Sequence, residues 1–176
     1  MSCGKQVPGV GNPWLSRESP CEGWRKLWLE GWVSTYWTFY YHIVWGTKNR
    51  ERVITAPRFE LIREAIAAVT VDMDVMIFAI GAMPDHLHVV VAIPPRISVA
   101  DAVHRMKGVS SHRVNQASGG PIDQFRWQPG YGAFSFGERS LNDIVSYVEN
   151  QREIHTRREL VRPSFELPTE LPTQPR

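Results

Sequence analysis

The sequence predicts an α+β fold of the ferredoxin-like split βαβ type, with a mostly antiparallel sheet and helices on one face. From Tyr36 onward, segments rich in aromatic and β-branched residues alternate with segments of helical periodicity. Their order is strand, helix, strand, strand, helix, strand, helix. Two turn residues separate the second strand from the third, as in an antiparallel hairpin. The first six elements match the split βαβ arrangement, and a C-terminal helix is added to it.

The composition is that of a soluble globular domain. The chain has 176 residues, of which 43% are hydrophobic and 22% charged, enough for one domain with a core. No apolar run approaches the roughly 20 residues that span a bilayer, and the N-terminus lacks the pattern of a secretory signal. With only two cysteines we expect no disulfide framework and a cytoplasmic location, and without a long apolar run we expect no membrane partner. The net charge of +2 permits a polyanionic partner without requiring one.

The two ends of the chain differ from its patterned middle. Residues 1–35 contain four tryptophans without a sustained helix or strand period, and we interpret them as an N-terminal extension of unknown role. Residues 36–160 form the patterned domain. Residues 161–176 contain four prolines, and we expect no packed structure in this tail.

The first half of the domain contains three predicted strands and one helix. Tyr36–Thr47 is rich in aromatic and β-branched residues and ends at a basic turn, residues 48–52. Pro57 then opens an amphipathic helix, whose apolar residues recur at spacings of three and four. Asp74–Met83 is the second strand, and a two-residue turn leads into the third, His86–Ile93.

The second half contains two predicted helices and one strand. Ser98 caps a helix, and an aspartate three residues later completes a box-like pair. Tyr131–Phe136 is a short aromatic strand. Ser140, again followed by an aspartate at the third position, starts the last helix, which is expected to run to about His155.

Two histidines lie two residues apart in the third strand. Side chains alternate faces along a strand, so His86 and His88 emerge on one face while Leu87 points to the other. Two neutral imidazoles on one face are half of a site for a divalent metal. The same pattern also fits ordinary strand histidines whose ring nitrogens are hydrogen-bonded, and the pair alone does not decide between them.

The last helix carries two polar side chains four residues apart. Tyr147 and Gln151 lie on one side of this helix, at the edge of its expected apolar stripe. Tyr147 offers a hydroxyl as a nucleophile, and Gln151 offers a carbonyl oxygen as a metal ligand. A hydrogen-bonded tyrosine at a helix edge is an equally simple interpretation of the tyrosine alone.

Taken together, these segments resemble the motifs of single-tyrosine transposases of the HUH type (histidine, hydrophobic residue, histidine). Met83–Val91 resembles the HUH strand, and Tyr41–Arg50 resembles the first strand and basic turn of that family. Trp127–Ser135 followed by Val145–Gln151 resembles the final strand and the tyrosine helix. The resemblance runs in order from Tyr36 to Arg157.

The resemblance implies an enzyme that cleaves and rejoins single-stranded DNA with hairpin ends. His86, His88 and Gln151 would be the ligands of Mg²⁺ or Mn²⁺, and Tyr147 would form a 5′-phosphotyrosine intermediate. It also implies a homodimer in a bacterial or archaeal cytoplasm, in which the tyrosine helix of one subunit completes the histidine site of the other. Such composite sites are expected from the family, and the sequence does not show whether the site forms within or between chains.

Within the family, the chain resembles the insertion-sequence 200/605-like transposases more than the REP-associated tyrosine transposases. The REP-associated relatives, which accompany palindromic repeats, tend to carry Asn-Pro near the position of Gln151. This chain has Asn150-Gln151-Arg152 and no proline there.

Several cations and one aromatic residue are candidate DNA contacts, because Lys and Arg pair with phosphates and aromatic rings stack on bases. For each cation, a solvated surface position is an equally simple interpretation. The candidates are Lys48, Arg50, Arg52, Arg105, Lys107, Arg113, Arg126 and Trp127. Ser110 and Ser111 are further candidates for phosphate contacts.

Two other classes of function also fit the sequence. The first is a non-cleaving hairpin-DNA-binding repressor or chaperone of the same fold, which would bind without a metal-dependent cut. The second is a split βαβ regulatory or ligand-binding domain whose histidines bind zinc or nothing, without preference for single-stranded DNA. A plasmid-type replication initiator or relaxase shares the histidine motif but is usually larger.

Overall fold

The computed structural model describes residues 37–118 and 124–151. The chain divides after Thr38, and all helices and strands given below belong to the unit Phe39–Arg176. The predicted N-terminal extension, the Pro-rich tail and the end of the last helix at His155 lie outside the described residues.

A four-stranded antiparallel sheet forms the centre of the domain. Its strands are β1 (Tyr40–Gly46), β2 (Met76–Met83), β3 (His86–Ala92) and β4 (Gly132–Phe136). They lie in the order β2-β3-β1-β4, and every neighbouring pair is antiparallel. This order is that of the split βαβ fold, so the predicted α+β class is confirmed.

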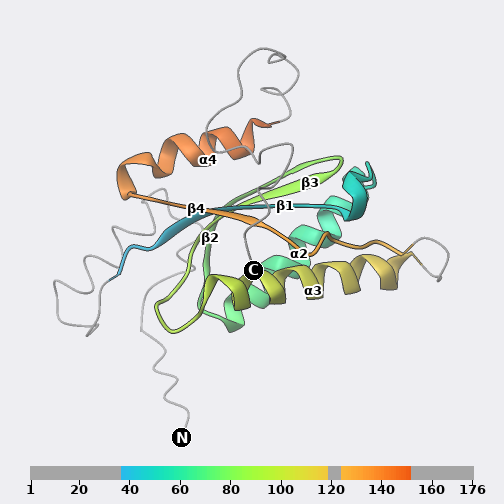
Figure 1. Cartoon of the computed structure of the whole chain (residues 1–176), viewed down its shortest axis with the longest axis horizontal. Helices are drawn as coiled ribbons and strands as arrows, with labels where there is room; N and C mark the ends of the chain where they lie inside the picture. The colour runs from blue at the N-terminus through green and yellow to red at the C-terminus, as the bar shows by residue number, and fades with distance from the viewer. Residues whose placement is uncertain (1–36, 119–123, 152–176) are drawn as a thin grey trace, which may run out of the picture. The chain divides into compact units, whose positions relative to one another are not determined.

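Helices cover both faces of this sheet (Figure 1). α2 (Ala56–Asp72) and α3 (Val99–Ala117) pack on one face, and α4 (Leu141–Glu149) lies on the other. As predicted, Ser98 caps α3: its hydroxyl oxygen accepts a hydrogen bond from the Asp101 backbone N–H at 3.0 Å. Ser140 precedes α4 without such a bond, because it belongs to a 3₁₀ turn and already has helical backbone angles. In the described part of the chain, no helix is long and apolar enough to cross a membrane.

The hydrophobic core lies between the sheet and the pair α2 and α3. Alternate residues of β1 and β3, among them Ile43, Leu87 and Val89, are fully buried there against helix residues such as Ile62 and Met106. As predicted for a strand, the intervening residues face the other way, toward α4. The domain therefore has an apolar layer on one side of the sheet and a layer containing histidines on the other.

Candidate active site

Helix α4 packs directly against β2 and β3. Gly81 of β2 permits this approach, because a Cβ at that position would clash with the backbone oxygen of Val148 and lie 3.2 Å from Gln151 Oε1. The contact buries Leu141 and Val148, and with them Tyr147 and Gln151. A side chain missing from one strand thus sets the position of the helix that carries the tyrosine.

The sequence predicted that Tyr147 and Gln151 would stay accessible at the edge of the apolar stripe, but both side chains are buried. Tyr147 is only 7% exposed, and Gln151, just beyond α4, is 1% exposed. They are buried because the face of the sheet opposite α4 carries histidines, against which polar side chains of the helix can pack. The ring of Tyr147 meets the rings of His42 and His88 edge-on, with centroids 6.3 Å and 6.1 Å away.

The two histidines of β3 lie side by side under α4, with ring centroids 5.0 Å apart. His86 Nδ1 is 2.7 Å from Asp85 Oδ1, and His86 Nε2 is 3.5 Å from Gln151 Nε2. Gln151 Oε1 is buried and has no hydrogen-bond partner among the described residues. Because the oxygen and nitrogen of an amide are assigned by the network, either end of Gln151 can face His86. The structure thus brings together the predicted set His86, His88, Gln151 and Tyr147.

His42 of β1 lies beside these residues, although no role was predicted for it from the sequence. It is fully buried, and its Nε2 is 2.8 Å from His88 Nδ1, with the two rings stacked. Burial lowers the pKa of His42 to about 4, so this imidazole is neutral near pH 7. The sequence signal was a histidine in the middle of an otherwise apolar strand. Its meaning depends on the pairing of β1 with β3, which sequence periodicity does not reveal.

No group of three or more His, Cys, Asp or Glu side chains in the described part of the chain is arranged to hold a metal ion. A third protein ligand beside His86 and His88 would therefore have to be of another type. The amide oxygen of Gln151 is such a group, because carbonyl oxygens are ligands for hard divalent cations.

The basic turn after β1 adjoins this site. Arg50 Nε lies 3.1 Å from Asp85 Oδ2, so Arg50 pairs with the carboxylate that also holds His86. Lys48 and Arg52 of the same turn are exposed, as is Arg50 itself. One of the three predicted cations is therefore tied to the site, and two point into solvent.

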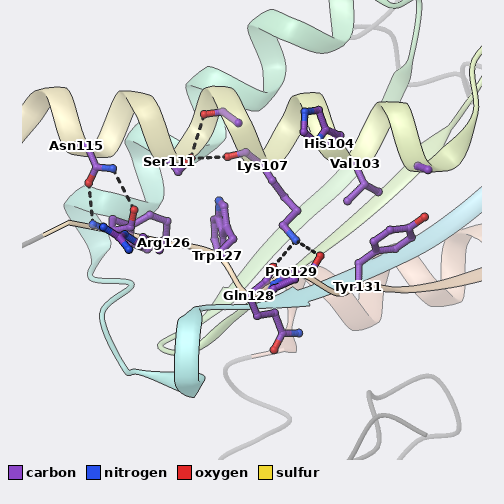
Figure 2. A pocket seen from close by; sticks show the side chains of 13 residues that line it. Val103, His104, Lys107, Ser111, Asn115, Arg126, Trp127, Gln128, Pro129 and Tyr131 are labelled. Atoms are coloured by element: carbon purple, nitrogen blue, oxygen red, sulfur yellow. Dashed lines mark hydrogen bonds between the residues drawn. The ribbon is translucent and has the colours of Figure 1, made fainter. Parts of the chain in front are cut away.

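A concave region lies on the other side of the sheet, between α3 and residues 125–131, with a volume of about 560 Å³ (Figure 2). Lys107 extends from α3 across this groove and donates hydrogen bonds to the carbonyl oxygens of Gln128, Pro129 and Gly130, at 2.5, 3.0 and 3.2 Å. Partial burial lowers its pKa. The ammonium group that was predicted to contact DNA thus connects α3 to the segment before β4.

Trp127 and Ser110 also have structural partners. The indole N–H of Trp127 donates to the hydroxyl of Ser110 at 3.0 Å, and its ring meets Trp45 and Phe125 edge-on. Ser110 is fully buried, so the predicted phosphate contact by Ser110 is wrong. Three of the predicted cations on this side of the domain are exposed: Arg105, Arg113 and Arg126.

The sequence matches a known family over most of its described length. The family model with the description "Transposase IS200 like" matches residues 35–151. The ISDra2 transposase TnpA of Deinococcus radiodurans is 24% identical over 121 residues, which cover 64% of this chain and 84% of that protein. The transposase for insertion sequence element IS200 of Salmonella typhimurium is 26% identical over 123 residues, which cover 68% of this chain and 80% of that transposase.

Two solved structures share the fold. A crystal structure described as that of a transposase from Deinococcus radiodurans has a TM-score of 0.54 at 24% identity, covering 68% of this chain and 95% of that one. The structure of a REP-associated tyrosine transposase bound to a REP hairpin has a TM-score of 0.52 at 18% identity, covering 70% of this chain and 74% of that one. These likenesses establish the fold, and the family match extends from the start of the domain to Gln151. The chain belongs to the IS200-like family of transposases.

Proposed function

We propose that this transposase cleaves and rejoins single-stranded DNA through a covalent 5′-phosphotyrosine on Tyr147, with Mg²⁺ or Mn²⁺ held by His86, His88 and Gln151. One observation carries the proposal. The four side chains come from β3 and from the α4 segment, and they meet in one buried place, with Tyr147 against His88 and Gln151 against His86.

The donor set fits a divalent cation. His86 Nδ1 is engaged with Asp85, which leaves Nε2 on the side of Gln151. The buried oxygen of Gln151 lacks a hydrogen-bond partner among the described residues, and coordination to a cation would satisfy its lone pair instead. When bound, the cation supplies Lewis-acid polarisation of the scissile phosphate.

The tyrosine carries the covalent step. Its hydroxyl oxygen attacks the phosphorus, the bond to the 3′ oxygen of the preceding nucleotide breaks, and the hydroxyl proton is passed on so that a free 3′-hydroxyl leaves. The 5′ phosphate stays on Tyr147 as a phosphodiester. Attack by another 3′-hydroxyl then reverses the step and joins a new strand, without any external energy source.

We further propose that the substrate is a single strand with hairpin ends and that the protein acts as a homodimer. The hairpin is suggested by the REP-associated structural neighbour, which was solved with one. In the present chain α4 packs on its own sheet. If the two subunits of a dimer exchanged α4, each composite site would keep the same contacts. Among the predicted cations, the exposed ones are available for phosphates, although Arg50 also pairs with Asp85: Lys48, Arg50, Arg52, Arg105, Arg113 and Arg126.

The test is adduct formation on a labelled single-stranded hairpin with Mn²⁺, resolved on a denaturing gel. The wild-type protein should form a covalent adduct, and Tyr147→Phe should form none while still binding the hairpin. Tyr41→Phe is the matched control, because Tyr41 packs against the core on the far face of β1 and should retain the adduct. An adduct that persists in Tyr147→Phe would remove this residue from the mechanism. Hairpin binding by the wild type with no adduct would instead support the non-cleaving repressor or chaperone.

A further inference from the structure

The two histidines of β3 are held at the same ring position by two different residues. His86 Nδ1 is 2.7 Å from a carboxylate oxygen of Asp85, and His88 Nδ1 is 2.8 Å from Nε2 of His42. A neutral imidazole carries one ring proton, either on Nδ1 or on Nε2, and the partner of one nitrogen fixes the state of the other. Two separate interactions, one with Asp85 and one with His42, can therefore determine which ring nitrogen of each histidine carries the proton.

We propose that Asp85 and His42 are positioning residues that hold both imidazoles as the Nδ1–H tautomer, with the lone pair on Nε2. This inference rests on the proposed function, since it assigns the Nε2 atoms to the metal. It adds His42 and Asp85, which lie outside the proposed ligand set, to the residues on which the site depends.

The geometry around His86 leaves one assignment. A carboxylate accepts hydrogen bonds, so the shared proton belongs to His86 Nδ1. Asp85 is itself fixed from two sides. Its second carboxylate oxygen pairs with Arg50 at 3.1 Å, and its backbone oxygen accepts from the backbone N–H and the hydroxyl of Thr47, at 2.9 and 3.1 Å. Arg50 therefore supports the histidine site through Asp85.

The bond between His42 and His88 has one proton and two possible directions. If His42 donated it, neutral His88 would carry its own proton on Nε2, the atom that a metal requires free. If His88 donates it, Nε2 keeps its lone pair, and neutral His42 accepts. Both rings are almost inaccessible, at 0% and 1% exposure, so water cannot readily replace His42. The pairing of β1 with β3, in which Val44 lies opposite His88, holds the two rings in register.

The experiment reads the tautomers directly, by long-range ¹H–¹⁵N correlation spectra of the metal-free protein at pH 7. In the wild type, His86 and His88 should both carry the proton on Nδ1. His42→Phe keeps a flat buried ring but removes the acceptor, so His88 alone should shift toward the Nε2–H form. Asp85→Ala should shift His86 alone. A wild-type His88 with its proton on Nε2, or a His88 unchanged in His42→Phe, would overturn the assignment to His42.

Two further variants separate positioning from packing. Phe134→Leu is the matched control, because Phe134 packs on the ring of His42 without bonding to His88, and both tautomers should stay as in the wild type. His42→Gln restores an acceptor oxygen and should return His88 toward Nδ1–H, which also serves if the phenylalanine variant misfolds. A Gln variant with no effect on His88, in a folded protein, would count against the proposal.

Metal affinity provides a second readout. Outer partners of metal-binding histidines typically contribute 10- to 100-fold in affinity, so calorimetric titration of His42→Phe with Mn²⁺ should show a loss of about that size. The spectra need neither metal nor DNA. A wild-type protein that fails to bind Mn²⁺ would therefore overturn the proposed function while the tautomer assignment stood. Normal Mn²⁺ binding by a protein whose histidines carry the proton on Nε2 would overturn the tautomer assignment and leave the proposed function standing.

Discussion

The two faces of the sheet are made from alternate residues of the same strands, yet they are built from different chemistry. Toward α2 and α3, β1 and β3 present Ile43, Leu87 and Val89, which are fully buried among other apolar side chains. Toward α4, the same two strands present His42 and His88, which are equally buried but polar. Along each strand, a residue that belongs to the apolar core is therefore followed by one that faces the candidate site.

This difference separates stability from function. Burial of apolar surface on the α2 and α3 side lowers the free energy of the folded state by roughly 25 cal/mol per Å². On the α4 side, burial of polar groups is unfavourable unless they bond to one another, as His42 does with His88 and Asp85 with His86. We therefore expect substitutions on the first face to act on the fold and those on the second face to act on the chemistry.

The sharpest test of this contrast uses neighbouring residues of β3. Leu87→Ala removes a fully buried side chain from the core and should cost about 2–5 kcal/mol of unfolding free energy. His86→Ala should cost less, because the His86 side chain is 13% exposed and lies outside the apolar core, yet it should abolish the covalent DNA adduct. Urea unfolding and the adduct gel measure the two effects. Equal stability losses in the two variants would show that the two faces do not divide the tasks in this way.

A second test moves α4 without replacing a site residue, although the added methyl group would also press on Gln151, 3.2 Å away. Gly81→Ala forces a methyl group against the backbone oxygen of Val148, so we expect a loss of roughly 1–3 kcal/mol and a strongly reduced yield of adduct. Gly108→Ala is the matched control: Gly108 lies within α3 with open space at its Cβ position, and alanine is the better helix former by about 1 kcal/mol. Adduct formation at the wild-type level in Gly81→Ala would mean that α4 need not lie where it packs here.

The strands and the hairpin were predictable because their signals are local. Alternation within His86–Ile93 assigned Leu87 and the two histidines to opposite faces, and the spacing of Ser98 and Asp101 gave the start of α3. The start of α4 was also found, although its expected cap at Ser140 does not form. Short-range rules predicted these elements because the physics that determines them acts over a few residues.

The features that were missed all depend on contacts between distant segments. His42 bonds to a residue 46 positions away, and its role follows from the pairing of β1 with β3. Tyr147 was predicted to be accessible because helical periodicity considers only the residues of its own helix. Its burial depends on the sheet against which that helix packs. Lys107 seemed to be a free cation, since the three carbonyls that it meets lie more than 20 residues along the chain.

The smallest effects are expected for the cations on the α3 side of the sheet. Here we compare Arg126, as a candidate DNA contact, with Lys107, as a structural cation. Arg126 is exposed, and its partner in the described chain is the amide of Gln124. If it contacts a phosphate, Arg126→Ala should lower hairpin affinity a few-fold and reduce the slope of log affinity against log salt by about 0.7 for single strands. Its unfolding free energy should change by less than about 0.5 kcal/mol, as for other surface positions.

Lys107→Met should behave in the opposite way. It keeps most of the aliphatic stem but leaves the carbonyl oxygens of Gln128, Pro129 and Gly130 without their common donor. Because these oxygens are exposed or only partly buried, water can replace the donor in part, and we expect a loss of about 0.5–1.5 kcal/mol of unfolding free energy. The salt slope should stay at the wild-type value, because the ammonium group serves the fold. A reduced slope with unchanged stability would instead identify Lys107 as a DNA contact. Lys107 and Arg126 would then have the same role.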